Sequence, residues 1–312
     1  MDSSPSSEPP LRSWRQSDSA ALRTLASSSL TQCAVLVLLL CMLAAVIGPW
    51  LAPQNPFSPA ELELMDAFTP PGEQGLSGQR YWLGADDQGR DVFSAILYGL
   101  RMSVLVGLAA VCGSMLIGVS LGLLAGYVGG WIDALITRLA DVQLTFPVLL
   151  VALLIFGLAR SVLPDGYRDE AAVYIIILAI ALSDWVQYAR TVRGAVMVEK
   201  QKDYVAAARL IGRSRLGIAV FHVLPNIMAS VLVIGTISFA LAIVTESTLS
   251  YLGVGLPPTQ PSLGTLIRIG QGFLFSGEWW ILFFPALMLL VLALSVNLVG
   301  DWLRDAFDPR LS

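Results

Sequence analysis

Charged residues are scarce in this sequence. Asp, Glu, Lys and Arg make up 13% of the 312 residues, whereas soluble domains carry about 25%. Hydrophobic residues make up 55% of the chain and lie mostly in long uncharged runs. These two values exclude an ordinary soluble protein and predict that the bilayer is the main solvent. The net charge of −4 argues against nucleic acid as a partner.

Residue types that bind metals or nucleotides are also few. His222 is the single histidine, and one imidazole supplies one ligand where a metal site needs several, so we expect a structural role for it. The three cysteines lie inside apolar runs without metal-ligand or disulfide spacing. Lys200 and Lys202, the two lysines, do not follow the glycine spacing of a phosphate-binding loop. We therefore expect no catalytic site, no metal site and no cofactor bound by this chain.

Six apolar runs predict an all-α integral membrane protein with six transmembrane helices. The runs cover residues 33–51, 102–127, 139–159, 171–188, 227–249 and 279–300, and Pro147 predicts a kink in the third. Serine-rich residues 1–32 are expected to form a disordered tail, 52–101 a proline-rich extramembrane loop, 102–302 a core of five spans with a loop at 189–226, and 303–312 a second tail.

The distribution of basic residues predicts the orientation. Six spans place both termini on the same side, together with the 189–226 loop. Thirteen of the 19 Lys and Arg residues fall on that side and six on the other. Because loops rich in Lys and Arg stay in the cytoplasm, we expect cytoplasmic termini, a cytoplasmic 189–226 loop and an extracytoplasmic 52–101 loop.

Small residues repeat along the second run. Gly118, Gly122 and Gly126 recur at four-residue spacing, which allows another helix to approach closely along that face. The alternative is that these glycines face lipid and have no partner.

The segment from Lys202 to Asn226 predicts two short helices. Asp203 can cap a helix over 204–211, and Gly212 can end it in the left-handed conformation. Ser214 can cap a second helix, which Pro225 bars from running into the fifth span without a break.

The first of these helices is too short to be stable alone in water. Ala206, Ala207 and Ala208 have small side chains that permit close approach by a large partner, and Arg209 and Arg213 add a basic flank. We therefore expect this helix to dock on a soluble partner protein.

The loop resembles that of the inner-membrane permease subunits of bacterial ABC importers. Their motif is EAA, three residues, Gly, nine residues and I-x-L-P. Ala207, Ala208, Gly212, Leu224 and Pro225 match it, whereas an alanine at 206 replaces the Glu and a histidine at 222 replaces the Ile. The segments LGADDQGRDVFSAILYGLRMS (83–103) and GDWLRDAFDPR (300–310) are similar to the second permease of the dipeptide, oligopeptide and nickel group.

This resemblance implies the type I permease fold of ABC importers, in the bacterial inner membrane. It also implies a second homologous permease, two cytoplasmic ATPases that bind ATP and Mg, and an extracytoplasmic binding protein, with peptide as the default substrate. The helix near 204–211 would be the coupling helix. The expected ATPase-coupling residues are Asp203, Tyr204, Ala206, Ala207, Ala208, Arg209, Gly212, Arg213, Ser214, Leu224 and Pro225.

Ionisable residues inside spans are candidates for a transport pathway, because burying charge in a membrane is costly. Glu246 and Asp184 are such residues, although both could simply lie near span ends. Asp86, Asp87 and Asp91 could suggest a calcium loop, but they lack its alternating ligands and terminal Glu, so a structural turn is favoured.

Two other classes of function stay open at this point. A secondary transporter driven by an ion gradient would place coupling groups on broken helices in two repeated halves, and no internal repeat is visible. A structural membrane subunit would leave the capped two-turn helix without a purpose.

Overall fold

The computed structural model describes residues 28–58 and 61–307. Within these ranges the chain forms helices and connecting segments but no β-strand, only the isolated bridges Gln74–Arg80 and Ala85–Asp91. The predicted all-α fold is confirmed.

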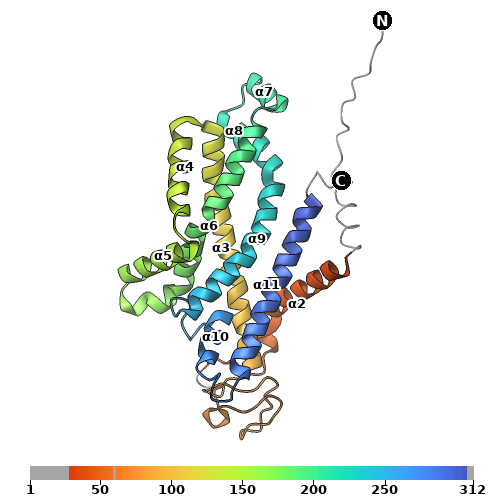
Figure 1. Cartoon of the computed structure of the whole chain (residues 1–312), viewed down its shortest axis with the longest axis vertical. Coiled ribbons are helices and arrows are strands. Elements are labelled where there is room, and N and C mark those ends of the chain that lie inside the picture. Colours follow the sequence, from red (N-terminus) through yellow and green to blue (C-terminus); the bar gives the residue numbers. More distant parts are fainter. Residues whose placement is uncertain (1–27, 59–60, 308–312) are drawn as a thin grey trace.

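The described residues form both long and short helices (Figure 1). The long ones are α2 (Ser29–Leu51), α3 (Val92–Val128), α6 (Arg168–Glu199), α9 (Leu224–Tyr251) and α11 (Trp280–Phe307). The short ones are α4 (Gly130–Leu144), α5 (Val148–Val162), α7 (Asp203–Leu210), α8 (Arg215–Ile218) and α10 (Leu263–Gln271). Two single 3-10 turns, η2 (Leu64–Asp66) and η3 (Asp165–Tyr167), and the π-helical η4 (Ala219–Val223) complete the described elements.

Five helical stretches are long and apolar enough to cross a membrane. They are Ser29–Leu51, Val92–Val128, Arg168–Glu199, Arg215–Tyr251 and Trp280–Ala306. The pair α4 and α5 passes the same test only when taken together, and the two helices are bent by 98°. Counting the bent pair as one span gives the predicted six.

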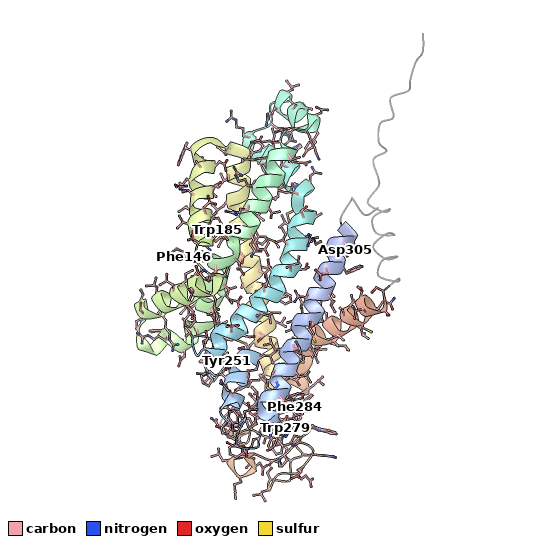
Figure 2. All side chains as sticks on the ribbon, in the orientation of Figure 1. Phe146, Trp185, Tyr251, Trp279, Phe284 and Asp305 are labelled. Carbon is pink, nitrogen blue, oxygen red and sulfur yellow. The ribbon has the colours of Figure 1, made fainter. Side chains whose placement is uncertain are left out.

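The third span differs from the single kinked helix expected at 139–159. The helix is interrupted between Leu144 and Val148, and Pro147 is the N-terminal cap residue of α5. Proline has no N–H to donate and disfavours helical geometry at the preceding residue, here Phe146, which lies at the corner (Figure 2). The observed bend is therefore a break rather than a kink.

Two helices begin earlier than the apolar runs indicate. The Asp91 carboxylate accepts the Ser94 N–H at 2.9 Å, so α3 starts at Val92 and the predicted 52–101 loop ends at Asp91. The Ser28 hydroxyl caps α2, which places 29–32, expected in the disordered tail, inside a helix. The rest of that predicted tail, residues 1–27, lies outside the described residues.

Helices α6, α9 and α11 also extend past the boundaries predicted from the apolar runs. Helix α6 continues to Glu199 and α9 begins at Leu224, so the connection predicted at 189–226 covers only 200–223 outside these helices. Helix α11 continues to Phe307 through the predicted tail 303–312, whose last five residues lie outside the described ranges. Apolar runs mark the membrane core, whereas helical hydrogen bonding continues beyond it.

The glycine stripe of α3 packs against α6, which lies beside it in Figure 1. A side-chain carbon added at Gly126 would lie 2.9 Å from the Arg193 carbonyl oxygen, and one at Gly118 or Gly122 would come closer still to α6 backbone. Close helix approach is thus confirmed, and the alternative of lipid-facing glycines is wrong. The stripe is used within the chain, so it is not a face for another subunit.

Two ion pairs attach α4 to the far half of α6. Arg193 Nη2 lies 2.8 Å from Asp133 Oδ2, and Arg190 pairs with Asp141. These contacts hold two of the basic residues that the sequence assigns to the cytoplasmic loop.

The molecule has two distinct ends (Figure 1). Helix α7 lies at one end, whereas the 52–91 loop and α10 lie at the other. At the loop end, Trp279 and Phe284 gather near the start of α11 (Figure 2), as aromatic residues do at membrane interfaces. Trp280 Nε1 donates to the Ala85 carbonyl at 3.1 Å, which fastens α11 to the loop. The two loops predicted for opposite sides of the membrane therefore do lie at opposite ends.

Candidate functional site

Helix α7 is the part of the chain expected to couple to an ATPase. It runs from Asp203 to Leu210, and Lys202 is its N-terminal cap residue without a side-chain hydrogen bond. Asp203 is thus the first helical residue, and its expected capping role is wrong. Its carboxylate still lies in the first turn, where negative charge is favourable beside the exposed helix N–H groups.

The end of α7 follows from the glycine. Gly212 has φ +81°, a left-handed conformation that side chains disfavour. The Gly212 N–H donates to the Arg209 carbonyl at 3.0 Å and the Arg213 N–H to the Ala208 carbonyl at 3.2 Å. This pair of hydrogen bonds is a Schellman motif, so the predicted left-handed end of the helix is confirmed.

A hydrogen-bond network around Tyr204 anchors α7 to the two long helices that flank it. The Tyr204 hydroxyl donates to Glu199 Oε1 at 2.8 Å, and Asn226 Nδ2 donates to the Tyr204 oxygen at 3.2 Å. Lys202 Nζ lies 2.8 Å from Glu199 Oε2. Burial, together with the neighbouring Glu199 carboxylate, raises the pKa of Tyr204 to about 12. Glu199 comes from the end of α6 and Asn226 from the start of α9, so α7 is joined to both.

The two faces of α7 differ. Val205 and Ala208 are buried in an apolar cluster with Ile218, Val223 and Ile227. Ala206, Ala207 and Arg209 are exposed on the opposite face.

Ala208 therefore packs on its own chain, and its expected place on the docking surface is wrong. The period of a helix explains this, because positions three apart lie on one face and Val205 fixes which face is inward.

The tip of α7 is formed by two large apolar residues that do not belong to the expected set of ATPase-coupling residues. Leu210 is 89% exposed and Ile211 is 81% exposed. Two adjacent large apolar side chains in water are unfavourable unless a partner covers them, so this tip suits a protein contact. Their position just before the helix-ending glycine was a signal available in the sequence.

The second short helix follows its prediction in part. The Ser214 hydroxyl accepts the Gly217 N–H at 3.1 Å, so the predicted cap of α8 is confirmed. The break expected before Pro225 is absent, because α8 continues through the π-helical η4 into α9. The wider π turn relieves the clash between a proline ring and the preceding turn. Pro225 is exposed at the start of α9, and Leu224 packs on the apolar cluster under α7.

Glu246 lies in a cage of hydroxyl groups near the other end of α9. Its carboxylate oxygens accept from Ser250 Oγ at 2.7 Å and from Ser103 Oγ at 3.0 Å, and the side chain has no exposed surface. The Ser103 oxygen also accepts the Leu263 N–H at 3.2 Å, which ties α10 to α3 and α9. The cage gives Glu246 a structural task, and its role in a pathway stays a prediction.

Asp184 is buried near the middle of α6. Beside it, Gln143 Nε2 donates to the Leu182 and Ser183 carbonyls at 2.9 and 2.8 Å, and Trp185 Nε1 donates to Gln143 Oε1 at 2.7 Å. Gln143 thus links the end of α4 to α6 by hydrogen bonds, next to the interruption between α4 and α5. The structure does not bring Asp184 and Glu246 into a common cluster of hydrogen bonds, and a pathway role for Asp184 also stays a prediction.

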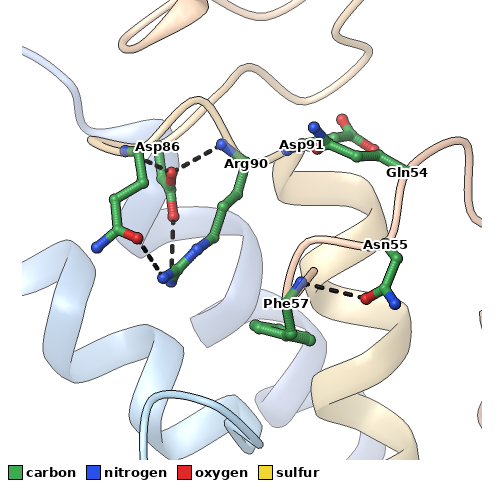
Figure 3. Close-up of polar contacts among 7 residues, drawn as sticks. Gln54, Asn55, Phe57, Asp86, Arg90 and Asp91 are labelled. Atoms are coloured by element: carbon green, nitrogen blue, oxygen red, sulfur yellow. Dashed lines mark hydrogen bonds and ion pairs between the residues drawn. The ribbon is translucent and has the colours of Figure 1, made fainter. Parts of the chain in front are cut away.

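At the opposite end, the acidic segment forms a turn (Figure 3). Asp86 Oδ1 accepts the N–H groups of Gln88 at 2.8 Å and Arg90 at 2.9 Å, and the Arg90 side chain lies over Phe57. The predicted structural turn is confirmed. Burial of the carboxyl raises the pKa of Asp86 to about 6, although the two N–H donors act in the opposite direction.

No group of three or more His, Cys, Asp or Glu residues in the ranges 28–58 and 61–307 could hold a metal ion.

The loop that contains Asp86 also exposes large apolar side chains, which include Trp82 and Leu76. Phe275 lies almost fully exposed after α10. Large exposed apolar side chains therefore lie at both ends of the molecule.

These features define a multi-pass membrane protein that presents a short, anchored helix at one end and a folded loop at the other. Comparison with known proteins identifies the class. The chain belongs to the family of binding-protein-dependent transport system inner membrane components, which matches residues 118–312. It is a multi-pass inner-membrane protein and a permease subunit of an ABC importer, that is, a transport subunit.

Several curated relatives align with most of the chain. A di/tripeptide transport system permease of Pseudomonas aeruginosa is 38% identical over 277 residues, which cover 89% of this chain and 87% of the relative. A dipeptide transport system permease of Haemophilus influenzae is 36% identical and covers 89% of each chain. An oligopeptide transport system permease of Bacillus subtilis is 35% identical over 285 residues, 91% of this chain and 87% of the relative.

Proposed function

We propose that this chain forms half of a translocation pathway for short peptides and pairs with a second, homologous permease. The relatives named above are peptide transport permeases, which supports peptide as the substrate class. Two cytoplasmic ATPases bind ATP and Mg and supply the energy, and this chain binds no nucleotide. The termini and α7 lie in the cytoplasm, and the 52–91 loop and α10 lie outside.

The observation that carries the coupling role is the exposed tip of α7, Leu210 and Ile211, on a helix anchored through Tyr204. An apolar tip on a two-turn helix fits a groove of a soluble partner, and its anchor passes movement of that partner to α6 and α9. An extracytoplasmic binding protein docks at the other end, where Trp82 and Phe275 are exposed.

A paired experiment tests both surfaces in the reconstituted importer. Leu210→Asp with Ile211→Asp should release the ATPase subunits while the extracytoplasmic protein is still captured. Trp82→Asp with Phe275→Asp should do the reverse. Both pairs are exposed, so neither should lower the thermal stability of the permease. If both double variants still bound the ATPase subunits and the extracytoplasmic protein, the proposal would be contradicted.

The substrate is tested separately, by uptake of a labelled dipeptide into proteoliposomes with unlabelled peptides and free amino acids as competitors. Competition by peptides alone supports the peptide class. Equal competition by amino acids would contradict it and leave the docking surfaces untouched. Uptake by the single chain without any ATPase would instead support a secondary transporter.

A further inference from the structure

A cavity of about 690 Å³ opens beside α7, at the ends of two candidate membrane spans. Helix α3 contributes Leu123, Leu124, Tyr127 and Val128 from its last two turns. The segment before α9 contributes Arg215, Leu216, Ile218 and Ala219. The spans Val92–Val128 and Arg215–Tyr251 each end at this cavity. The apolar run 102–127 ends at Tyr127, so the α3 side of the cavity lies where that run ends, at the level expected for lipid head groups.

Three arginines, Arg209, Arg213 and Arg215, line the cavity, and no acidic residue does. None of the three forms an ion pair or a side-chain hydrogen bond within the described part of the chain, unlike Arg190 and Arg193 nearby. Three unpaired cations gathered on one site favour an anionic ligand.

The hydroxyl of Tyr127 is a second, independent sign of a ligand. It is buried and has no hydrogen-bond partner among the residues described. Buried hydroxyl groups are nearly always paired, so an oxygen atom of a ligand is the partner that this site lacks. Leu124 and Val128 continue along α3 into an exposed stripe with Leu116, which suits an alkyl chain.

We propose that this cavity binds an anionic phospholipid of the inner leaflet. The arginines hold the phosphate, Tyr127 donates to a phosphate or ester oxygen, and the acyl chain lies on Leu124 and Val128. A soluble ATPase segment would satisfy the charges but not the apolar wall that continues along a membrane span. The proposal rests on the cytoplasmic placement of α7 and not on the peptide substrate.

The test uses the complete importer in nanodiscs of phosphatidylcholine that contain phosphatidylglycerol. Co-purified lipid is counted per permease by mass spectrometry after transfer to detergent. The wild type should retain phosphatidylglycerol in preference to phosphatidylcholine. Each arginine near an anionic surface contributes about fivefold in affinity, so Arg213→Gln with Arg215→Gln should weaken retention about 25-fold. Arg138→Gln, an exposed arginine outside this cavity, should leave retention unchanged.

Leu124→Asn tests the apolar wall separately and should reduce retention without a change in its salt dependence. Equal loss in the Arg138 control, or full retention in the double variant, would overturn the proposal. Complete displacement by glycerol phosphate in solution would overturn it in favour of a soluble anion site. Loss of the lipid whenever ATPase subunits bind would overturn it in favour of an ATPase contact.

Discussion

Replacing Gly212 tests whether α7 depends on its left-handed end. At φ +81° a residue other than glycine costs about 1 to 2 kcal/mol, and asparagine costs less because it tolerates this region. A Cβ atom at Gly212 would meet nothing within 4 Å, so the cost arises from the backbone and not from a clash within the chain. The conformational equilibrium of the helix end should therefore shift about five- to thirty-fold.

Helix α7 has only eight residues, so a penalty of this size is large relative to its own stability. We expect Gly212→Val to increase hydrogen exchange over 203–213 and to reduce substrate-stimulated ATP hydrolysis of the reconstituted importer. Gly212→Asn should retain most of the activity, and Gly212→Ala should fall between the two.

The comparison of asparagine with valine separates two explanations, because the two side chains are similar in size. If both variants lost activity equally, bulk in the partner's groove and not backbone strain would be the cause. Wild-type activity of Gly212→Val would refute the reasoning, because backbone strain at position 212 would then have no effect on ATP hydrolysis.

Two further substitutions have matched control positions, and a third prediction concerns pH. Ala208→Glu places a charge in the cluster under α7 and should destabilise the permease by several kcal/mol in thermal unfolding, whereas Ala206→Glu, on the exposed face, should leave unfolding unchanged. Gly122→Ala should cost about 1 to 3 kcal/mol because its Cβ would meet α6 backbone; Gly157→Ala, with open space around it, should not destabilise, and equal losses would refute close packing. Because burial raises the pKa of Asp86 to about 6, the folded loop favours the protonated carboxyl. The stability of the folded loop should therefore fall as pH rises through that value. Protease resistance of the 52–91 loop should thus be higher at pH 5 than at pH 7, and a pH dependence that persists in Asp86→Asn would contradict this origin.

Local rules were sufficient at three places where the backbone needed one particular kind of residue, although the capping rule failed at Asp203. Gly212 ends α7, Ser214 caps α8, and the glycines of α3 allow α6 to approach, all as the sequence predicts. Each of these features depends on neighbours within a few residues or on the absence of a side chain, so no knowledge of the tertiary fold was needed.

Other features arise from contacts between distant segments and could not be predicted locally. The 98° bend between α4 and α5 lies beside the hydrogen bonds from Gln143 to α6. Their acceptors are the carbonyls of residues 39 and 40 positions further along the chain. A proline rule predicts a perturbed helix but not its direction. The network of Glu199, Tyr204 and Asn226 likewise joins three helices, so it emerges only once the fold brings them together.

The buried face of α7 follows from the helix period. Three consecutive alanines suggested a uniform small surface, yet consecutive helix positions point about 100° apart and cannot share one face. Val205 identifies the inward side, and Ala208 follows it by three positions. The apolar pair Leu210–Ile211 then falls outside the buried face, where its exposure requires a partner.

Helix α9 carries contacts at both ends of the molecule. Asn226 near its start bonds to the anchor of α7, and Glu246 near its end holds the cage that fixes α10. Twenty residues separate these two positions, roughly 30 Å of helix at 1.5 Å per residue, which is about the thickness of a hydrocarbon core. One continuous helix therefore links the anchor of α7 to the cage that fixes α10, with hydrogen bonds at both attachments and no loop between them.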